Sequence, residues 1–223
     1  MTQHSDLPRR AGLARFLHLV VAVLALGGVG IELVVALTGG AGPALTHAER
    51  IVRLFSYFTI QSNLLIGGVS VALLLDPRRD GRVFRVLRLD ALLCIAVTGI
   101  VYNTVLRGLV ELTGAGVVSN SMLHVLAPLF AVVVWVWVGP RPRMSGRTVW
   151  WSVVYPLAWL AYTFTRGAVT GWYPYPFLDV NELGYPGALA GAGLVSVVFL
   201  ALAWGLRWVD GRLPGDAVRV PRR

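Results

Sequence analysis

The chain has 223 residues, of which 56% are hydrophobic and only 14% are charged, with a formal net charge of +9. Soluble domains carry about 25% charged residues, so this composition excludes an ordinary soluble protein and indicates a membrane protein. All 20 basic residues are arginines in short clusters between apolar runs. That pattern indicates membrane topology rather than a phosphate-binding face, and it argues against nucleic acid as a partner.

Six apolar runs follow one another along the chain. Each holds about 20–25 residues, which at about 1.5 Å per residue crosses a hydrocarbon core of about 30 Å. The connections are short, so neighbouring spans should pack as antiparallel hairpins. The sequence therefore predicts an all-α, polytopic membrane protein: a six-transmembrane-helix bundle at 13–209, an N-terminal arm at 1–12 and a basic tail at 210–223. The predicted spans are 13–37, 52–75, 86–109, 117–138, 149–169 and 186–208.

The first run, 13–37, follows a basic arm and so superficially resembles a secretory signal peptide. It is longer than the apolar core of a signal peptide, and no clear small-residue cleavage site precedes a soluble domain. We therefore expect a first span that is retained.

The arginines also predict an orientation. Arg50, Arg53, Arg107 and Arg166 fall on the side of the bundle that carries the loops after spans one, three and five, whereas the other sixteen of the 20 arginines fall on the side of the two termini. By the positive-inside rule, both termini are expected in the cytoplasm and the protein in the cell membrane.

The second span contains an unusually polar stretch between Phe55 and Asn63. Its polar residues are Ser56, Thr59, Gln61, Ser62 and Asn63. Hydroxyl and amide groups in hydrocarbon need partners, so this face is expected to look into the protein or into a wet cavity. Counted from the outer ends of their spans, Thr59 and His124 share a depth of about 10 Å.

Further polar residues gather in the same outer half of the predicted bundle. They are Glu32, Asn63, Tyr102, Asn103, Arg107, Asn120 and Arg166. The asparagines are more readily explained by helix packing. Ionisable groups are costly in a membrane, so a functional role is favoured for four residues: Glu32, Arg107, Arg166 and His124. An ion pair from Glu32 to Arg107 or Arg166 that merely holds the bundle together is the alternative.

The connection after the fifth span, 170–182, is rich in aromatic residues and proline. Trp and Tyr prefer the membrane–water interface, so this composition is typical of an aromatic belt. The alternative is a stiff, proline-braced cover over the polar site, with Trp172 and Tyr173 as supporting residues.

Thr59 and His124 together meet the minimum requirement for acyl transfer. A threonine hydroxyl becomes a nucleophile when a base takes its proton, and neutral histidine is the usual base near pH 7. Asn63, Asn120 or Arg107 could donate hydrogen bonds to an oxyanion. A site at this depth would take a lipid ester or another amphiphile from the membrane.

Other chemistries fit this sequence less well. A bis-histidine haem needs two histidines at one depth, yet His18 and His124 lie toward opposite faces of the membrane. No carboxylate–histidine set has metal-ligand spacing, and Cys94 is the single cysteine, so no metal and no cofactor are expected. A non-enzymatic lipid-binding or small-solute transport protein is the second hypothesis.

Three segments together resemble a known family. They are Tyr57-Phe58-Thr59-Ile60, Asn120-Ser121-Met122-Leu123-His124, and Tyr155-Pro156 followed by Gly171-Trp172-Tyr173-Pro174-Tyr175-Pro176-Phe177-Leu178. In order and spacing they resemble the androgen-induced and androgen-dependent membrane hydrolases, most closely their bacterial six-span relatives. That resemblance implies a threonine hydrolase of fatty acid esters of hydroxy fatty acids, with Thr59 as the nucleophile and His124 as the base.

Overall fold

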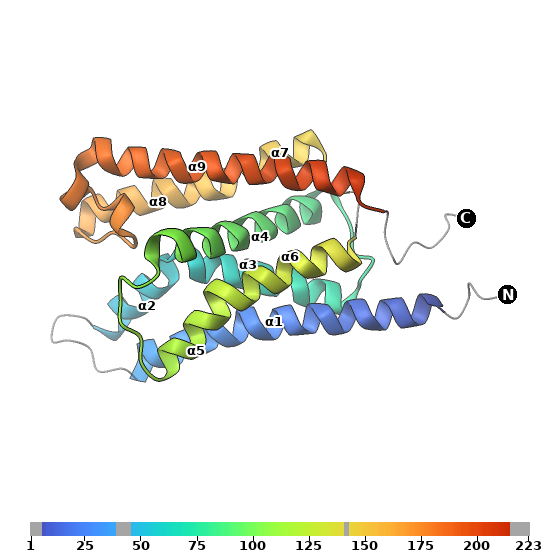
Figure 1. Cartoon of the computed structure of the whole chain (residues 1–223). Helices are drawn as coiled ribbons and strands as arrows, with labels where there is room; N and C mark the ends of the chain where they lie inside the picture. The colour runs from blue at the N-terminus through green and yellow to red at the C-terminus, as the bar shows by residue number, and fades with distance from the viewer. Residues whose placement is uncertain (1–5, 39–45, 141–142, 215–223) are drawn as a thin grey trace.

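The computed structural model describes residues 6–38, 46–140 and 143–214, and within these ranges every regular element is a helix. The long helices lie side by side in an elongated bundle (Figure 1). Helix α1 begins and helix α9 ends at the same end of the bundle, which we call the termini end. The opposite end, where α2, α5 and the α8–α9 connection lie, is called the distal end.

The helices have the following bounds. They are α1 (Asp6–Thr38), α2 (His47–Ser56), α3 (Phe58–Leu75), α4 (Arg82–Val101), α5 (Ala115–Ser121), α6 (Ala127–Val138), α7 (Gly146–Ser152), α8 (Val154–Thr170) and α9 (Val180–Arg212). Two π-helical turns, η1 (Tyr102–Leu106) and η2 (Met122–Leu126), and one 3-10 turn, η3 (Pro176–Leu178), complete the described elements.

Five helical segments are long and apolar enough to cross a membrane. They are Ala11–Thr38, Phe58–Leu75, Arg82–Leu106, Ala115–Val138 and Val180–Arg212. Large apolar side chains also cover the outside of these helices, as at Val83, Leu194 and Trp208. Apolar surface on both the inside and the outside of a bundle is typical of a membrane protein. The predicted all-α class is confirmed for the described residues.

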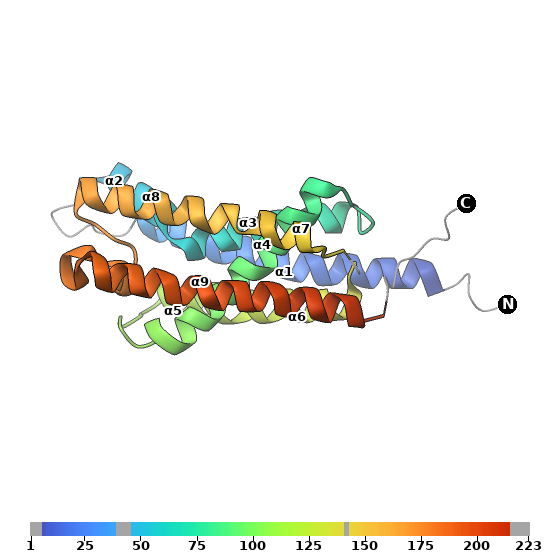
Figure 2. The ribbon, with the colours of Figure 1, turned by 90° about the horizontal axis from the view of Figure 1, so that it is seen from above.

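The predicted fifth span, 149–169, is divided at Val153 into α7 and α8. Pro156 has no N–H for the carbonyl of Ser152, and this loss of a helical bond accounts for the irregular turn. The two helices still run nearly end to end along α9 (Figure 2). Residues 1–5 of the predicted arm and 215–223 of the predicted tail lie outside the described residues.

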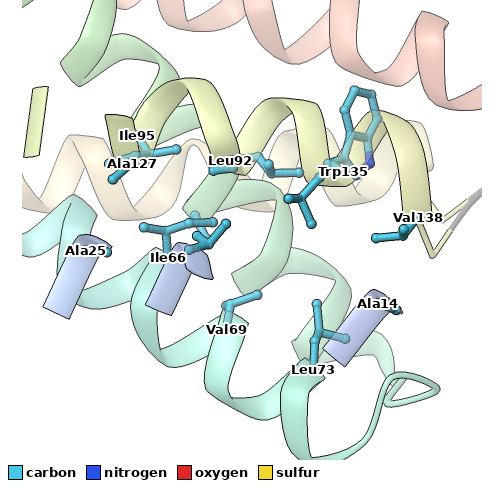
Figure 3. Close-up of a cluster of buried hydrophobic side chains, with 14 residues drawn as sticks. Ala14, Ala25, Ile66, Val69, Leu73, Leu92, Ile95, Ala127, Trp135 and Val138 are labelled. Atoms are coloured by element: carbon cyan, nitrogen blue, oxygen red, sulfur yellow. The ribbon is translucent and has the colours of Figure 1, made fainter. Parts of the chain in front are cut away.

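Two buried clusters share α4 as a common wall. The first fills the space between α1, α3, α4 and α6, with Ala25, Ile66, Leu92 and Ala127 among its members (Figure 3). The second joins α4 to α8 and α9 and includes the fully buried Cys94. Helix α4 therefore packs against both groups of helices, and α3 also contacts α8 directly.

Polar side chains fasten the helix connections at the termini end. The buried carboxylate of Asp210 accepts the backbone N–H groups of Arg143 at 2.6 Å and Met144 at 2.9 Å. Asp80 bonds Arg85 and Arg143, both at 2.7 Å. The hydrogen bond from Arg85 is the main cause that holds the pKa of Asp80 well below its ordinary value. Asp80 therefore stays charged and keeps the α3–α4 and α6–α7 connections together.

Candidate active site at the distal end

The predicted second span, 52–75, is interrupted two residues before Thr59. Tyr57 has an extended backbone (φ −67°, ψ 129°), so α2 ends at Ser56 and α3 begins at Phe58. Thr59 is thus the second residue of a helix, where backbone N–H groups have no helical acceptor. Its N–H donates to the hydroxyl oxygen of Tyr175 at 3.2 Å. The positive end of the α3 dipole therefore lies at the Thr59 hydroxyl.

Side chains satisfy the carbonyl groups that this interruption frees. Gln61 Nε2 donates to the carbonyl of Phe55 at 2.8 Å, and Trp159 Nε1 donates to the carbonyl of Ser56 at 3.0 Å. A helix can be interrupted at membrane depth only where such partners replace the lost backbone bonds. Gln61 therefore supports the backbone, which accounts for part of the polar stretch that the sequence shows here.

His124 lies in a second irregularity, the π-helical turn η2. The N–H of Ala127 bonds the carbonyl of Met122, so the carbonyl of Leu123 loses its α-helical donor. The α-helical donor for the carbonyl of His124 would come from Pro128, which has no N–H. Pro128 therefore favours the π turn and leaves two carbonyl groups without their usual partners.

The side chains of two asparagines donate hydrogen bonds to these carbonyl groups. Asn63 Nδ2 donates to the carbonyl of Leu123 at 3.2 Å and to that of Thr59 at 2.9 Å. Asn103 Nδ2 donates to the carbonyl of His124 at 3.3 Å. An amide nitrogen has two hydrogens, so the fully buried Asn63 has no donor left for an oxyanion. The predicted oxyanion role does not fit Asn63.

Thr59 and His124 face each other across α3 and η2. Thr59 Oγ1 is 3.3 Å from His124 Nε2, and His124 Nδ1 is 3.3 Å from the backbone carbonyl of Asn120. Because a carbonyl only accepts, Nδ1 carries the proton and Nε2 presents its lone pair to the threonine. The ring of Tyr102 stacks on the imidazole with centroids 4.1 Å apart. The structure thus brings the side chains of Thr59 and His124 within hydrogen-bond distance of each other.

Tyr175 is the third group at Thr59, and the sequence did not single it out. Its hydroxyl oxygen is 3.3 Å from Thr59 Oγ1. Since this oxygen already accepts the Thr59 N–H, its own proton can be donated to Oγ1 or to a substrate oxygen. The neighbouring Tyr173, predicted as a supporting residue, packs against Phe164 and Gly167 instead. Both tyrosines of the Tyr-Pro-Tyr-Pro segment are buried, and nothing in the sequence shows that Tyr175 rather than Tyr173 lies at Thr59.

Glu32 and Asn120 also lie at the site. The half-buried carboxylate of Glu32 accepts a hydrogen bond from Ser119 Oγ, and Asn120 Nδ2 donates to the hydroxyl of Tyr102 at 2.7 Å. Among the described residues, no ion pair joins Glu32 to an arginine. The alternative of a Glu32–arginine pair that holds the bundle together is therefore wrong.

The two predicted arginines lie elsewhere. Arg107 is exposed just after η1 and lines neither cavity at Thr59; its nearest polar contact is Asn103 Oδ1 at 3.5 Å. An oxyanion role for Arg107 is not supported by this position. Arg166 bonds Glu49 at 3.3 Å, and its guanidinium lies 4.8 Å from the centroid of the Trp172 ring.

Arg166, Arg53, Glu49 and Trp172 form a cluster that we call the latch. Arg53 also lies over the Trp172 ring, at 4.9 Å, and bonds Glu49 at 2.8 Å. The hydrogen bond from Arg53, with Arg166 adding to it, lowers the pKa of Glu49 below its ordinary value. Cation–π contacts of this kind fix an indole ring. The latch therefore holds the α8–α9 connection, and with it Tyr175, over the site.

Thr59 and Tyr175 lie where two cavities meet. The first, the distal cavity, has a volume of about 450 Å³ and contains the polar groups of Glu32, Asn120 and His124 in its wall. The second, the apolar pocket, has a volume of about 180 Å³ and is lined by residues of α3, α4, α8, α9 and the α8–α9 connection. The hydroxyl of Thr59 is therefore reachable from a partly polar space and from an apolar one.

No group of His, Cys, Asp and Glu in the described ranges has the arrangement of a metal site. Comparison of the chain with protein-family models, with curated proteins and with solved structures finds no match. The resemblance to the androgen-induced hydrolases, which depends on three short segments, stays a prediction. The function is inferred below from the chemistry of the site.

Proposed function

We propose that this protein is an integral membrane hydrolase that cleaves a fatty acyl ester with Thr59 as nucleophile and His124 as base. The observation that carries this proposal is the hydrogen-bonded series from Thr59 Oγ1 through the imidazole to the carbonyl of Asn120. The carbonyl fixes the tautomer in which Nε2 is the acceptor. A nucleophile, a base and a group that orients the base are the parts that acyl transfer requires.

The reaction would proceed in two steps. Thr59 Oγ1 attacks the ester carbonyl carbon while His124 Nε2 takes the hydroxyl proton. The Tyr175 hydroxyl and the positive end of α3 stabilise the oxyanion, and the alcohol leaves with the proton from His124. His124 then takes a proton from water, which attacks the acyl-threonine. As the bond from the acyl carbon to Thr59 Oγ1 breaks and the fatty acid leaves, His124 returns that proton to Oγ1. The family resemblance would make the alcohol a hydroxy fatty acid.

We further propose that the chain crosses the cell membrane six times with both termini in the cytoplasm. The α7–α8 pair would supply the sixth span, because it runs beside α9 over much of the length of the bundle (Figure 2). The common location of the ends of α1 and α9, together with the excess of arginine there, supports this orientation. The Thr59 site would then lie toward the outer leaflet.

A lipophilic fluorophosphonate, which reacts with activated hydroxyl nucleophiles, tests the proposal on the purified full-length protein. Labelling should fall at least about a hundredfold in Thr59→Ala and in His124→Gln, because the first lacks the nucleophile and the second the base. Thr59→Ser should keep measurable labelling. Thr104→Ala, which removes an exposed hydroxyl near the same end, should label like the wild type.

Folding is checked through Cys94, the single cysteine, which is completely buried and reacts with a thiol reagent only when the chain opens. Labelling that survives Thr59→Ala in a protein whose Cys94 stays protected would assign the nucleophile to another residue. Absence of labelling in a well-folded wild type, together with absence of ester hydrolysis, would overturn the hydrolase proposal.

A further inference from the structure

The apolar pocket extends away from Thr59 along α9. On that helix its wall runs from Ala192 to Leu200, which corresponds to about 12 Å at about 1.5 Å per residue. The near end of the pocket is formed by Thr59 and Tyr175, and the far end by residues such as Val153 and Leu200. The pocket is thus a passage that begins at the nucleophile and continues toward the middle of the bundle.

The wall of this pocket suits a hydrocarbon chain. Nearly all of its lining side chains are aliphatic or aromatic; the polar exceptions away from Thr59 and Tyr175 are Thr98 and Ser196. Ser196 already donates its hydroxyl proton to the carbonyl of Ala192 at 2.8 Å, so its hydroxyl group does not need an acceptor on a ligand. The buried hydroxyl of Thr98 has no hydrogen-bond partner among the described residues, and it is the one polar group of this part of the wall that an apolar ligand would leave unpaired.

The pocket also reaches the outer surface of the bundle between α8 and α9. Leu157 of α8 lines it and is 54% exposed, and Val195 and Leu200 of α9 are partly exposed. Figure 2 shows α8 and α9 running alongside each other with α4 between them in projection. In a membrane this surface faces acyl chains, so a lipid chain can enter sideways without crossing water.

The distal cavity differs in chemistry and in position. It lies on the other side of Thr59, and its wall contains a carboxylate, an amide, an imidazole and the hydroxyl of Tyr102. Polar groups of this kind suit the alcohol half of an ester, which leaves as a hydroxyl compound. The distal cavity thus offers several polar groups where the apolar pocket offers almost none, although much of its wall, including Leu54 and Leu123, is apolar as well.

We infer that the acyl chain of the substrate enters from the bilayer between α8 and α9, fills the apolar pocket, and leaves the alcohol half in the distal cavity. The α9 residues Val195 and Ser196, halfway along the pocket, then determine which acyl lengths are accepted. This inference rests on the proposed hydrolase function for its kinetic consequence, but the location of the chain can be tested without turnover.

The kinetic test compares p-nitrophenyl butyrate, octanoate and palmitate as substrates of the full-length protein. Ser196→Phe places a ring halfway along the pocket, so kcat/KM for the palmitate ester should fall about tenfold or more relative to the butyrate ester. Val195→Phe is a second variant that fills the same level. Ala201→Phe adds an equal ring on the exposed face of α9 and should leave the order of the three esters unchanged.

The second test locates the chain directly. A fatty methyl ketone with a diazirine at the end of its chain resembles the ester around the carbonyl and cannot be hydrolysed. After illumination, the adduct should map to α8 or α9 between Val153 and Leu200, and Ser196→Phe should remove it while Ala201→Phe keeps it. Cys94 protection verifies that each variant is folded.

The outcomes separate this inference from the proposed function. Adducts in the pocket of a protein that hydrolyses none of the esters would support the acyl site and overturn the hydrolase. Hydrolysis that depends on Thr59, with no change of chain-length order in either ring variant, would overturn the acyl site and retain the hydrolase. Adducts confined to the distal cavity would show that the acyl chain of the ligand lies there and not in the apolar pocket, and would overturn the inference.

Discussion

The two ends of the bundle bury polar groups for different purposes. At the termini end, buried groups such as Asp210 bind the backbone of the neighbouring connection. At the distal end, the backbone departs from α-helical geometry at Tyr57, in η1, in η2 and at Gly184 near the start of α9. There, polar side chains first satisfy the freed carbonyl groups, and only the remainder face a cavity.

This difference shows how a site can be recognised in an apolar protein. The number of polar residues at one depth of the bundle does not reveal the site, because Gln61, Asn63 and Asn103 all donate to backbone carbonyls. Buried backbone groups must be paired, so their partners are assigned first. After that assignment, the hydroxyl of Thr59 and the Nε2 lone pair of His124 are left to act on a ligand.

The largest expected effect comes from Tyr175→Phe, which removes the proposed oxyanion donor. The rate of ester hydrolysis should fall about a hundredfold or more, as on loss of one oxyanion donor elsewhere. Tyr173→Phe is the matched control, because the ring of Tyr173 packs against Phe164 and should keep doing so. Comparable losses in both variants would mean that the connection matters through packing alone.

Asn63→Leu should lower the free energy of unfolding by about 2 kcal/mol, because the buried carbonyl of Leu123 loses the donor that replaces its missing helical bond. The measurement is the temperature at which Cys94 becomes reactive toward a thiol-specific fluorophore. Asn103→Leu, at an exposed position, should cost less. An unchanged Asn63→Leu protein would contradict the carbonyl-supporting role of this residue.

At the termini end, Asp210→Ala should cost about 2 kcal/mol of stability, since two backbone N–H groups lose a charged acceptor. Fluorophosphonate labelling of the molecules that remain folded should stay at the wild-type level. A specific loss of labelling at a temperature where Cys94 is protected would show that the two ends are coupled, contrary to the comparison drawn above.

The smallest effect is expected in the latch. Because the pKa of Glu49 is lowered in the folded protein, its ion pairs contribute stability above its ordinary value of 4.5, and this contribution is lost as the pH falls through the folded pKa. The protection of residues 171–178 against hydrogen exchange, measured relative to the intrinsic exchange rate at each pH, should therefore fall below about pH 4.5. Glu49→Gln should show the same loss of protection already at pH 7, whereas Glu111→Gln, at an exposed acid outside the latch, should not.

The long helices and the pairing of Thr59 with His124 could be predicted from the sequence, because the length of an apolar run and the position of a residue along it convert to distances through the rise of a helix. Features that depend on tertiary contacts could not be predicted in this way. Nothing at Tyr57 is a helix breaker, and the interruption there becomes visible only with its side-chain partners. Arg107 looked equivalent to the site residues by depth, yet its backbone turns extended directly after η1 and the side chain lies outside.

The position of Tyr175 in the chain determines when the site can form during synthesis. Thr59 and His124 are 65 residues apart in the chain, whereas Tyr175 follows Thr59 by 116 residues on the connection before the last helix. Ribosomal synthesis delivers these groups in that order. A nascent chain whose first helices already lie in the membrane would therefore hold the proposed nucleophile and base without Tyr175, and the proposed site would become complete only when the final hairpin has been inserted.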